Sequence, residues 1–112
     1  MSECIFCKII NKEIPATIIQ EDNDIIVVKD IAPKAPIHFL IIPKKHSKDI
    51  TFLQDGEDVI LAAKLIFTAK NLAKNLGGNG EFRLVANTGK SVGQSIFHTH
   101  FHFLSGKTLQ DL

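Results

Sequence analysis

The chain has 112 residues, which suits a single domain over residues 1–112 with one hydrophobic core. Lys and Arg number 13 and Asp and Glu number 12, and the formal net charge of +1 is too weak a field to favour nucleic acid or a membrane surface as a partner. The start of the chain lacks the pattern of a secretion signal, and two cysteines are too few for a secreted disulfide scaffold. We therefore expect a cytoplasmic protein.

The first half of the chain predicts a short helix and then three strands. Pro15 limits the amphipathic helix, because the residue before a proline disfavours the helical conformation. Two β-branched runs separated by the polar residues 21–24 are typical of a hairpin, and Pro43 ends a third, apolar run. The expected elements are a helix at residues 4–12 and strands at residues 17–19, 25–28 and 38–42.

The second half predicts one long helix and two further strands, at residues 81–86 and 98–104, joined by a glycine-containing loop at residues 87–95. The helix is expected from Gly56 to Leu76, with Asp55 as its cap and Gly77–Gly78 as its stop. Apolar residues at the helical period are Val59, Ala62, Ala63, Ile66, Ala69, Ala73 and Leu76. The order of elements indicates an α+β fold: a mainly antiparallel five-stranded sheet with one long helix and a short N-terminal helix.

The long helix carries more apolar residues than one core-facing stripe requires. The additional residues are Ile60, Leu61, Leu65, Phe67 and Leu72. A second copy of the chain is the commonest way to cover such a surface. We therefore expect a homodimer.

The segment from Gly93 to Leu104 has histidine at three alternate positions. Side chains alternate between the faces of a strand, so His98, His100 and His102 would share one face, with neighbouring histidines about 6.6–7 Å apart. The intervening phenylalanines would then enter the core. A lone histidine on an apolar strand is usually structural. Three on one face are costly to keep without a use, which indicates a functional site.

An imidazole suits nucleotidyl transfer, because it is a neutral nucleophile near pH 7 and its phosphoramidate can be hydrolysed in a second step. The middle histidine, His100, is the natural nucleophile, although the sequence does not show which group holds its ring in the required tautomer. The glycine-containing loop would bring backbone N–H groups to the phosphate. Ser95 has a hydroxyl that could give a proton to the departing atom.

The Gly-Gln-Ser segment followed by His-φ-His-φ-His-φ-φ, where φ is apolar, resembles the signature of the histidine triad (HIT) superfamily, with Thr99 in one φ position. Further segments resembling its Hint branch are residues 6–10, 13–15, 30–33, 35–38 and 42–46. The resemblance implies a single, homodimeric HIT domain of α+β class. It also implies a purine nucleoside phosphoramidase that cleaves AMP-containing phosphoramidates or acyl-adenylates through a covalent nucleotidyl-histidine and releases AMP.

The resemblance also assigns roles to individual residues. His100 matches the nucleophile, His102 the histidine near the α-phosphate and leaving group, and Asp30 the acid that binds the ribose hydroxyls. Groups around the phosphate and the scissile bond match Ser95 and the backbone of Gly93 and Gln94. The purine pocket matches Phe6, Ile9, Val28 and Ile31, with Asn87 as a polar pocket residue. An aromatic residue is familiar in the family where Val28 stands, so we expect weaker purine stacking.

Cys4, Cys7 and His46 form a second group of potential ligands. Read alone, they indicate either two buried thiols with a surface histidine or, less well, a redox pair, since no βαβ context surrounds the cysteines. The resemblance implies a structural zinc ion bound by these three residues and His98. Two thiolates and two imidazoles supply the four ligands of a tetrahedral zinc ion. The proposed chemistry does not require this metal in any step.

Two other functions remain open from the sequence. His98 and His100 could share a catalytic metal, since alternating histidines on a strand can chelate, and the protein would then be a metalloenzyme. A non-catalytic nucleotide-binding protein could keep the same pocket. His38, at the start of an apolar strand, is expected to be structural rather than catalytic.

Overall fold

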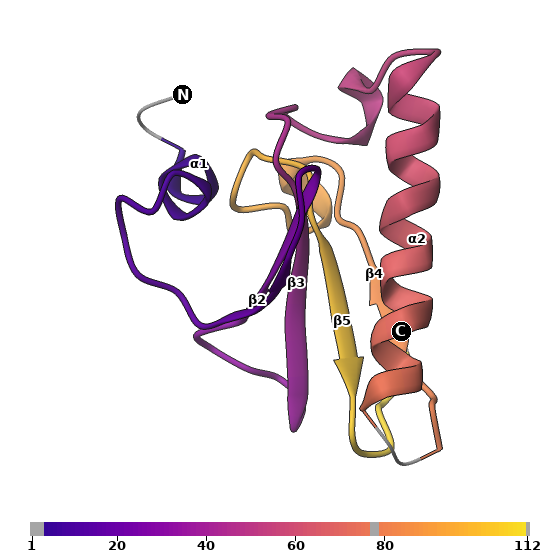
Figure 1. Ribbon diagram of the computed structural model, residues 1–112. Helices are drawn as coiled ribbons and strands as arrows, with labels where there is room; N and C mark the ends of the chain where they lie inside the picture. The colour runs from indigo at the N-terminus through magenta and orange to yellow at the C-terminus, as the bar shows by residue number, and fades with distance from the viewer. Residues whose placement is uncertain (1–3, 77–78, 112) are drawn as a thin grey trace.

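The computed structural model describes residues 4–76 and 79–111 and has the expected α+β architecture. Five strands form one antiparallel sheet in the order β1-β2-β3-β5-β4. A short helix lies on one side of the sheet and a long helix on the other (Figure 1). The elements are α1 (Ile5–Ile10), β1 (Ile18–Glu21), β2 (Ile25–Lys29), β3 (Ile37–Pro43), α2 (Glu57–Asn75), β4 (Arg83–Val85) and β5 (Phe101–Ser105), with 3₁₀ turns η1 (Ile50–Phe52) and η2 (Lys90–Val92).

The β1–β2 hairpin forms where the β-branched runs predict it. The carboxylate of Asp22 accepts hydrogen bonds from the backbone N–H groups of Asp24 (2.8 Å) and Ile25 (2.9 Å), which closes the turn. The preceding helix is shorter than predicted. It ends at Ile10, with Asn11 as its C-cap, and Lys12 takes a left-handed conformation at φ 63°.

The sheet separates two apolar clusters, because alternate residues of each strand face opposite sides. The cluster on the α2 side contains Ile25, Val27, Phe39, Ile41, Leu65, Ala69, Leu72 and Phe103. The smaller cluster on the α1 side contains Phe6, Ile26, Val28, Leu40 and Ile42. Fewer buried apolar residues cover the sheet on the α1 side, and the candidate active site lies on this side.

The helix α2 differs from the prediction in its cap and in the face that it buries. Gly56 is its N-cap without a side-chain hydrogen bond, so the prediction that Asp55 caps the helix is wrong. The predicted stop at Gly77–Gly78 lies outside the described residues. The helix packs on the sheet through Leu61, Leu65, Ala69, Leu72 and Ala73. Val59 and Ile66, predicted within the core stripe, are 61% and 48% exposed.

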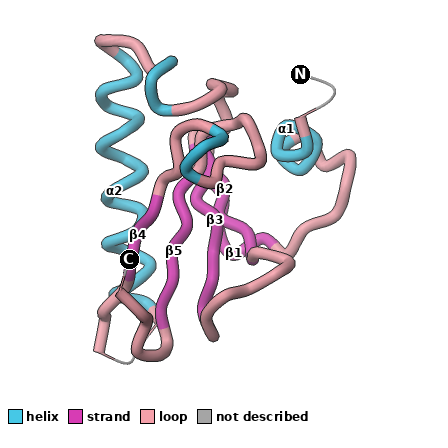
Figure 2. Tube along the Cα trace, turned by 180° about the vertical axis from the view of Figure 1, so that it is seen from behind, coloured by secondary structure: helices cyan, strands magenta, loops and turns pink. Residues whose placement is uncertain are grey.

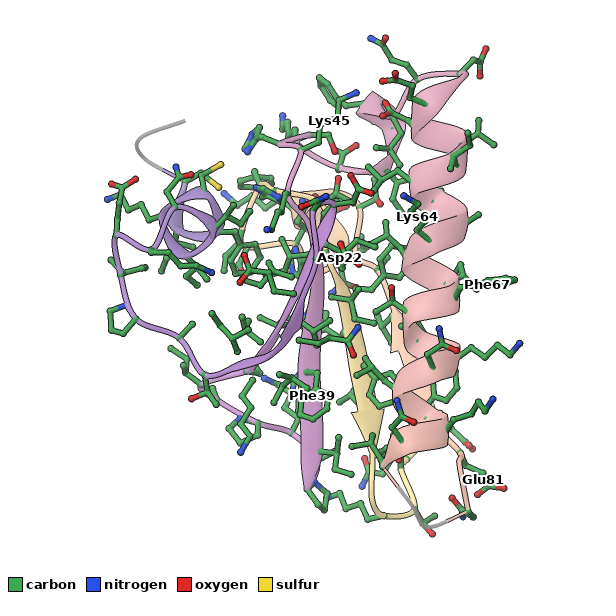
Figure 3. All side chains as sticks on the ribbon, viewed as in Figure 1. Asp22, Phe39, Lys45, Lys64, Phe67 and Glu81 are labelled. Atoms are coloured by element: carbon green, nitrogen blue, oxygen red, sulfur yellow. The ribbon has the colours of Figure 1, made fainter. Side chains whose placement is uncertain are left out.

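The start of α2 is held by Asp58, which lies in its first turn. The Asp58 carboxylate accepts a hydrogen bond from the backbone N–H of Gln54 and another from the ammonium of Lys45, each at 2.8 Å. Lys64, nearly two turns further along, pairs with Asp24 of the β1–β2 hairpin at 2.6 Å. Figure 3 shows Lys45 and Lys64 on the side of α2 that faces the sheet. Within the described residues, no helix has the length and apolar character needed to cross a membrane.

The last strand begins at Phe101, three residues later than the predicted start at His98. The contacts of Thr99 explain the difference. Its backbone N–H donates to the carbonyl of Ser47 at 2.8 Å, and the hydroxyls of Thr99 and Ser47 are hydrogen-bonded to each other at 2.7 Å. These bonds hold residues 98–100 against the Ser47 segment rather than in the sheet. Figure 2 shows the loop that contains η2 at the same end of the sheet as the start of β5.

Candidate active site

A cleft of about 440 Å³ opens on the α1 side of the sheet, over β3, β5 and the loop that leads to β5. Seven predicted site residues line it, namely Phe6, Asp30, Asn87, Gly93, Ser95, His100 and His102. Six further residues that line it were not assigned a site role: Lys34, His38, Leu40, Val85, Ile96 and Leu104. The cleft thus gathers residues from α1, the segment before β3, and the C-terminal third of the chain.

The alternation of the histidine segment largely holds, although the strand is shorter than predicted. His102 lies opposite Leu40 in the β3–β5 register, on the α1 side, whereas Phe103 lies opposite Phe39 and is fully buried on the α2 side. The rings of His100 and His102 have centroids 5.1 Å apart. The prediction that every phenylalanine of this segment enters the core is wrong for Phe97, which is 41% exposed.

His100 presents one defined nitrogen for chemistry. Its Nδ1 lies 2.7 Å from the backbone carbonyl oxygen of His98, and a carbonyl can only accept, so Nδ1 carries the hydrogen. The lone pair is therefore on Nε2. Burial lowers the pKa of His100, partly opposed by the His98 carbonyl and Asp30, which keeps the imidazole neutral and nucleophilic near pH 7.

His102 and His38 are joined by a hydrogen bond of 2.9 Å between His102 Nδ1 and His38 Nε2. Burial, together with the neighbouring His100 and His38, lowers the pKa of His102 to about 4, against the charge of Asp30. Burial also lowers the pKa of His38. Both rings are therefore neutral near pH 7.

Asp30 both shapes its turn and faces the cleft. Its Oδ1 accepts a hydrogen bond from the backbone N–H of Ala32 at 2.8 Å. Its Oδ2 lies 3.4 Å from His38 Nε2. A turn-forming role and a binding role therefore coexist in one carboxylate.

The loop before the triad is organised by Gln94, whose side chain is buried. Its Oε1 accepts from the Gly89 N–H (2.8 Å), and its Nε2 donates to the carbonyls of Lys48 (2.8 Å) and Ile96 (3.1 Å). The backbone N–H groups of Gly93 and Gln94 donate to the carbonyls of Lys90 and Gly89, and Gly93 lines the cleft. Gly93 has φ +108°, which a residue with a side chain rarely adopts.

Three of the four residues predicted for the purine pocket do not line the cleft. Val28 is buried in the α1-side core, Ile9 packs on the edge of that core, and Ile31 is 98% exposed. Phe6 lines the cleft and makes an edge contact with His100 at 4.9 Å between ring centroids. The remaining apolar lining comes from residues that the sequence did not single out for the site, namely Leu40, Val85, Ile96 and Leu104.

Cys4, Cys7, His46 and His98 are brought together beside the cleft, with their ligand atoms within 4.8 Å of one another. Cys4 Sγ and His98 Nδ1 are 3.4 Å apart, Cys7 Sγ and His46 Nδ1 are 3.4 Å apart, and the two Nδ1 atoms are 3.1 Å apart. Tetrahedral zinc with ordinary Zn–N and Zn–S bonds requires about 3.5 Å for each N–S pair and about 3.3 Å for an N–N pair. These donors fit a zinc ion.

The tautomer of His98 also suits a metal ligand. Its Nε2 lies 2.8 Å from the carbonyl oxygen of Pro43 and must donate to it, which leaves the Nδ1 lone pair directed at the thiols. A metal shared by His98 and His100 is not supported, because His98 Nδ1 belongs to this cluster and His100 Nδ1 donates to a carbonyl.

Asp30, His38 and His102 form a second set of potential ligand atoms within 4.8 Å. Here the hydrogen positions oppose a metal. His38 Nδ1 accepts a hydrogen bond from the backbone N–H of Lys34 at 3.0 Å, so the single hydrogen of the neutral ring is on Nε2. That nitrogen has no lone pair for a metal while the bond to Lys34 is kept.

His38 lines the cleft, although the sequence analysis expected only a structural role for it. Its side chain is buried, and its position at the start of an apolar strand favours a structural role. Only the pairing of β3 with β5 places it beside the triad, because Leu104 lies opposite His38 and His102 opposite Leu40, which makes the two histidines diagonal neighbours. Nothing within β3 or β5 alone indicates that register.

Comparisons with known proteins agree with this geometry. The HIT domain model matches residues 11–109. An uncharacterized HIT-like protein of Synechocystis is 45% identical over 105 residues, 94% of this chain and 91% of that protein. A HIT family hydrolase of Clostridium thermocellum superposes with a TM-score of 0.93 at 37% identity, over 100% of this chain and 97% of the other. One from Legionella pneumophila gives a TM-score of 0.91 at 43% identity, over 96% of each chain. The chain belongs to the HIT domain family.

Proposed function

We propose that this protein hydrolyses AMP-containing phosphoramidates or acyl-adenylates through a covalent nucleotidyl intermediate on His100. The observation that carries this proposal is the bond from His100 Nδ1 to the His98 carbonyl, because it leaves Nε2 as a lone-pair nitrogen on a ring that lines the cleft. A neutral imidazole of this kind is a competent nucleophile at phosphorus. The similarity to HIT family hydrolases supports the same class of reaction.

In the first step, His100 Nε2 forms a bond to the α-phosphorus and the bond from phosphorus to the leaving nitrogen or oxygen breaks. The leaving atom takes its electron pair and, where it is an amine, a proton, for which the Ser95 hydroxyl, which lines the cleft, is the predicted donor. In the second step, water attacks the phosphorus and the bond from phosphorus to Nε2 breaks, so Nε2 recovers its lone pair and AMP is released. The proton lost by water restores Ser95 where Ser95 has donated one, and otherwise goes to solvent. The imidazole ends as it began.

The remaining cleft residues suit a nucleotide. The free oxygen of Asp30 is an acceptor for ribose hydroxyls, and Phe6, Leu40 and Ile96 form an apolar wall for a purine ring. His102 adds a neutral hydrogen-bond donor beside the nucleophile. A cleft of about 440 Å³ suits a small ligand rather than a polymer, so we propose one purine nucleotide as the substrate.

We also propose that zinc at Cys4, Cys7, His46 and His98 has a structural role. All four side chains of that group are potential ligands, which leaves no protein-free position of the kind that a catalytic zinc keeps. The metal would join α1 to the segment that precedes β5 and so hold His100 in place. The chemistry at phosphorus would then proceed without the metal.

The experiment is rapid quenching of turnover with an adenosine phosphoramidate, followed by mass spectrometry of the peptides. We expect AMP on the peptide that contains His100. His100→Ala should lower kcat on the order of 10⁴–10⁶-fold, as for other lost nucleophiles. Lys74→Ala, a charge removal on the exposed side of α2, is the matched control and should turn over normally. An active His100→Ala protein would refute the mechanism.

A second candidate is a nucleotide-binding protein without catalysis. It would bind AMP and adenosine phosphoramidates in the same cleft. Tight binding of the phosphoramidate with no AMP released over hours would favour this candidate.

A further inference from the structure

We propose that His38 is a positioning residue that fixes His102 in the tautomer with its hydrogen on Nε2. The inference rests on the proposed function for its catalytic consequence, but the tautomer itself is a property of the resting protein. It follows from a chain of hydrogen bonds that begins at the backbone of Lys34 and ends at the cleft. Each link in this chain has only one possible direction.

The first link determines where the hydrogen of His38 lies. The backbone N–H of Lys34 can only donate, and it lies 3.0 Å from His38 Nδ1. His38 Nδ1 must therefore be the acceptor. Because the ring is buried and neutral, its single hydrogen is on Nε2.

Asp30 supports the same arrangement from the other side. Its Oδ1 is already used by the N–H of Ala32, and its Oδ2 lies 3.4 Å from His38 Nε2. A carboxylate at that position favours a hydrogen on Nε2 and disfavours a lone pair there. Lys34 and Asp30 therefore favour the same tautomer of His38, with the lone pair on Nδ1 and the hydrogen on Nε2.

The last link transfers this choice to His102. His38 Nε2 donates to His102 Nδ1 across 2.9 Å, so His102 Nδ1 must accept and its own hydrogen must be on Nε2. This nitrogen is the one left to meet a ligand in the cleft. His102 is therefore a neutral donor to a phosphate oxygen or to the leaving atom. The opposite tautomer would set a lone pair against that oxygen.

His38 itself is a poor candidate for direct contact with substrate. Its side chain is 2% exposed, both of its nitrogens are engaged, and it lies diagonally beside His102 on the neighbouring strand. Its effect on turnover therefore passes through His102. Outer partners of this kind commonly change the function of a histidine by about 10- to 100-fold.

The first test uses the resting wild-type protein with ¹⁵N-labelled histidine and long-range ¹H–¹⁵N correlation spectra at pH 7. His102→Gln and His38→Gln spectra assign the two rings. We expect protonated Nε2 and unprotonated Nδ1 for both residues. Protonated Nδ1 on His102 would overturn the proposal. Because no substrate is present, this result is independent of whether the proposed hydrolysis occurs.

The second test compares His38→Gln with His38→Leu in the full chain. A glutamine side-chain amide can still donate to His102 Nδ1, whereas leucine cannot. We expect His38→Leu to lower kcat about 10- to 100-fold with AMP affinity nearly unchanged, and His38→Gln to recover most of the loss. Equal kcat for the two variants, whether high or low, would refute the positioning role.

Thermal unfolding of each variant shows whether the fold is kept. If His38→Leu does not fold, the wild-type spectrum and the kcat of His38→Gln still test the proposal. Loss of activity in a folded His38→Gln protein that keeps the expected His102 tautomer would contradict it. Absence of turnover in the wild type would refute the proposed function, while the spectrum alone would then decide the tautomer.

Discussion

His100 Nδ1 donates to the backbone carbonyl of His98 at 2.7 Å, and the ring of that same His98 lies among Cys4, Cys7 and His46. One residue therefore contributes its backbone to the nucleophile and its side chain to the candidate zinc site. Movement of His98 would alter both.

The position of the nucleotidyl group on His100 follows from this contact. Because Nδ1 carries the hydrogen, the phosphorus should be bonded to Nε2. Trapping the intermediate with ¹⁵N-labelled histidine should give ³¹P–¹⁵N coupling to Nε2 alone. Coupling to Nδ1 would mean that the hydrogen bond to His98 is broken during turnover and that the geometry described for the nucleophile is not the reactive one.

Ser95→Ala should have an effect that depends on the leaving group. An amine leaves poorly without a proton, whereas the carboxylate released from an acyl-adenylate leaves without one. We expect kcat to fall by about 10²-fold or more for phosphoramidates, within the usual range for general-acid catalysis, and much less for acyl-adenylates. Steady-state rates on the two substrate classes provide the measurement. Equal losses on both would exclude proton donation by Ser95.

Replacement of both cysteines, Cys4→Ser with Cys7→Ser, should remove zinc and destabilise the fold while leaving substantial hydrolysis. Metal bound only by the native state adds directly to the free energy of unfolding. A loss of 1 kcal/mol lowers Tm by roughly 4–8 °C in a domain of about 100 residues, so we expect at least that decrease. Elemental analysis and thermal unfolding provide the measurement.

Chelator treatment of the wild type, followed by zinc add-back, is the control for that variant. It should lower and then restore Tm. Wild-type protein that is purified free of metal and shows no response to chelator would refute the zinc site. Loss of catalysis in chelator without loss of folding would favour a metalloenzyme.

We propose that α2 forms the contact of a homodimer. Val59, Ile60, Ile66 and Phe67 make an exposed apolar patch on the helix, and Figure 3 shows Phe67 pointing away from the sheet. Self-association is the commonest way to cover such a patch. Ile60→Glu with Phe67→Glu should weaken the dimer by more than about tenfold, as expected when two central apolar residues are lost.

Light scattering over a range of concentrations measures this change. Ile18→Glu, which replaces an exposed isoleucine on β1, is the matched control and should leave the dimer intact. A wild-type protein that remains monomeric at micromolar concentration would contradict the prediction.

The pKa of His102, lowered to about 4 chiefly by burial, predicts the direction of a pH effect on stability. An unfolded histidine takes up a proton near pH 6.5, but folded His102 does not do so until about pH 4. The unfolded state therefore binds more protons in this window, and the free energy of unfolding decreases as the pH falls from about 6.5 to 4. Urea unfolding at several pH values measures the slope.

His102→Gln should make that slope shallower by up to about one proton, since the group responsible is gone. An unchanged slope in this variant would assign the pH dependence to other groups. Direct NMR titration of His102 gives an independent check, with no protonation expected between pH 7 and pH 5.

The secondary structure of this protein follows largely from its sequence. The β-branched runs and the proline stops locate β1, β2 and β3 within a few residues, and the alternation in the final segment correctly assigns His102 and Phe103 to opposite faces. Residue type and period 2 suffice for these features because each depends on contacts within one segment.

The sequence predicted the buried face of α2 less accurately than it predicted the strands. Apolar residues surround much of the helix, so two stripes compete, and the one with larger side chains, Leu61, Leu65 and Leu72, packs on the sheet. Val59 and Ile66 are left exposed. The lining of the cleft could not be read from residue type for a similar reason, because Ile31 lies on an exposed turn and Val28 is buried in the core, although both are apolar residues.

The sequence by itself determined the HIT motif, the identity of the nucleophile candidate His100, and the set of Cys and His residues that could bind zinc. Only the tertiary structure decided the hydrogen positions. Those of His100, His102 and His98 depend on the His98 carbonyl, on His38 and on the Pro43 carbonyl. A period of two assigns a side chain to a face, but strand register and loop contacts select its partner, and the partner decides which imidazole nitrogen carries the hydrogen.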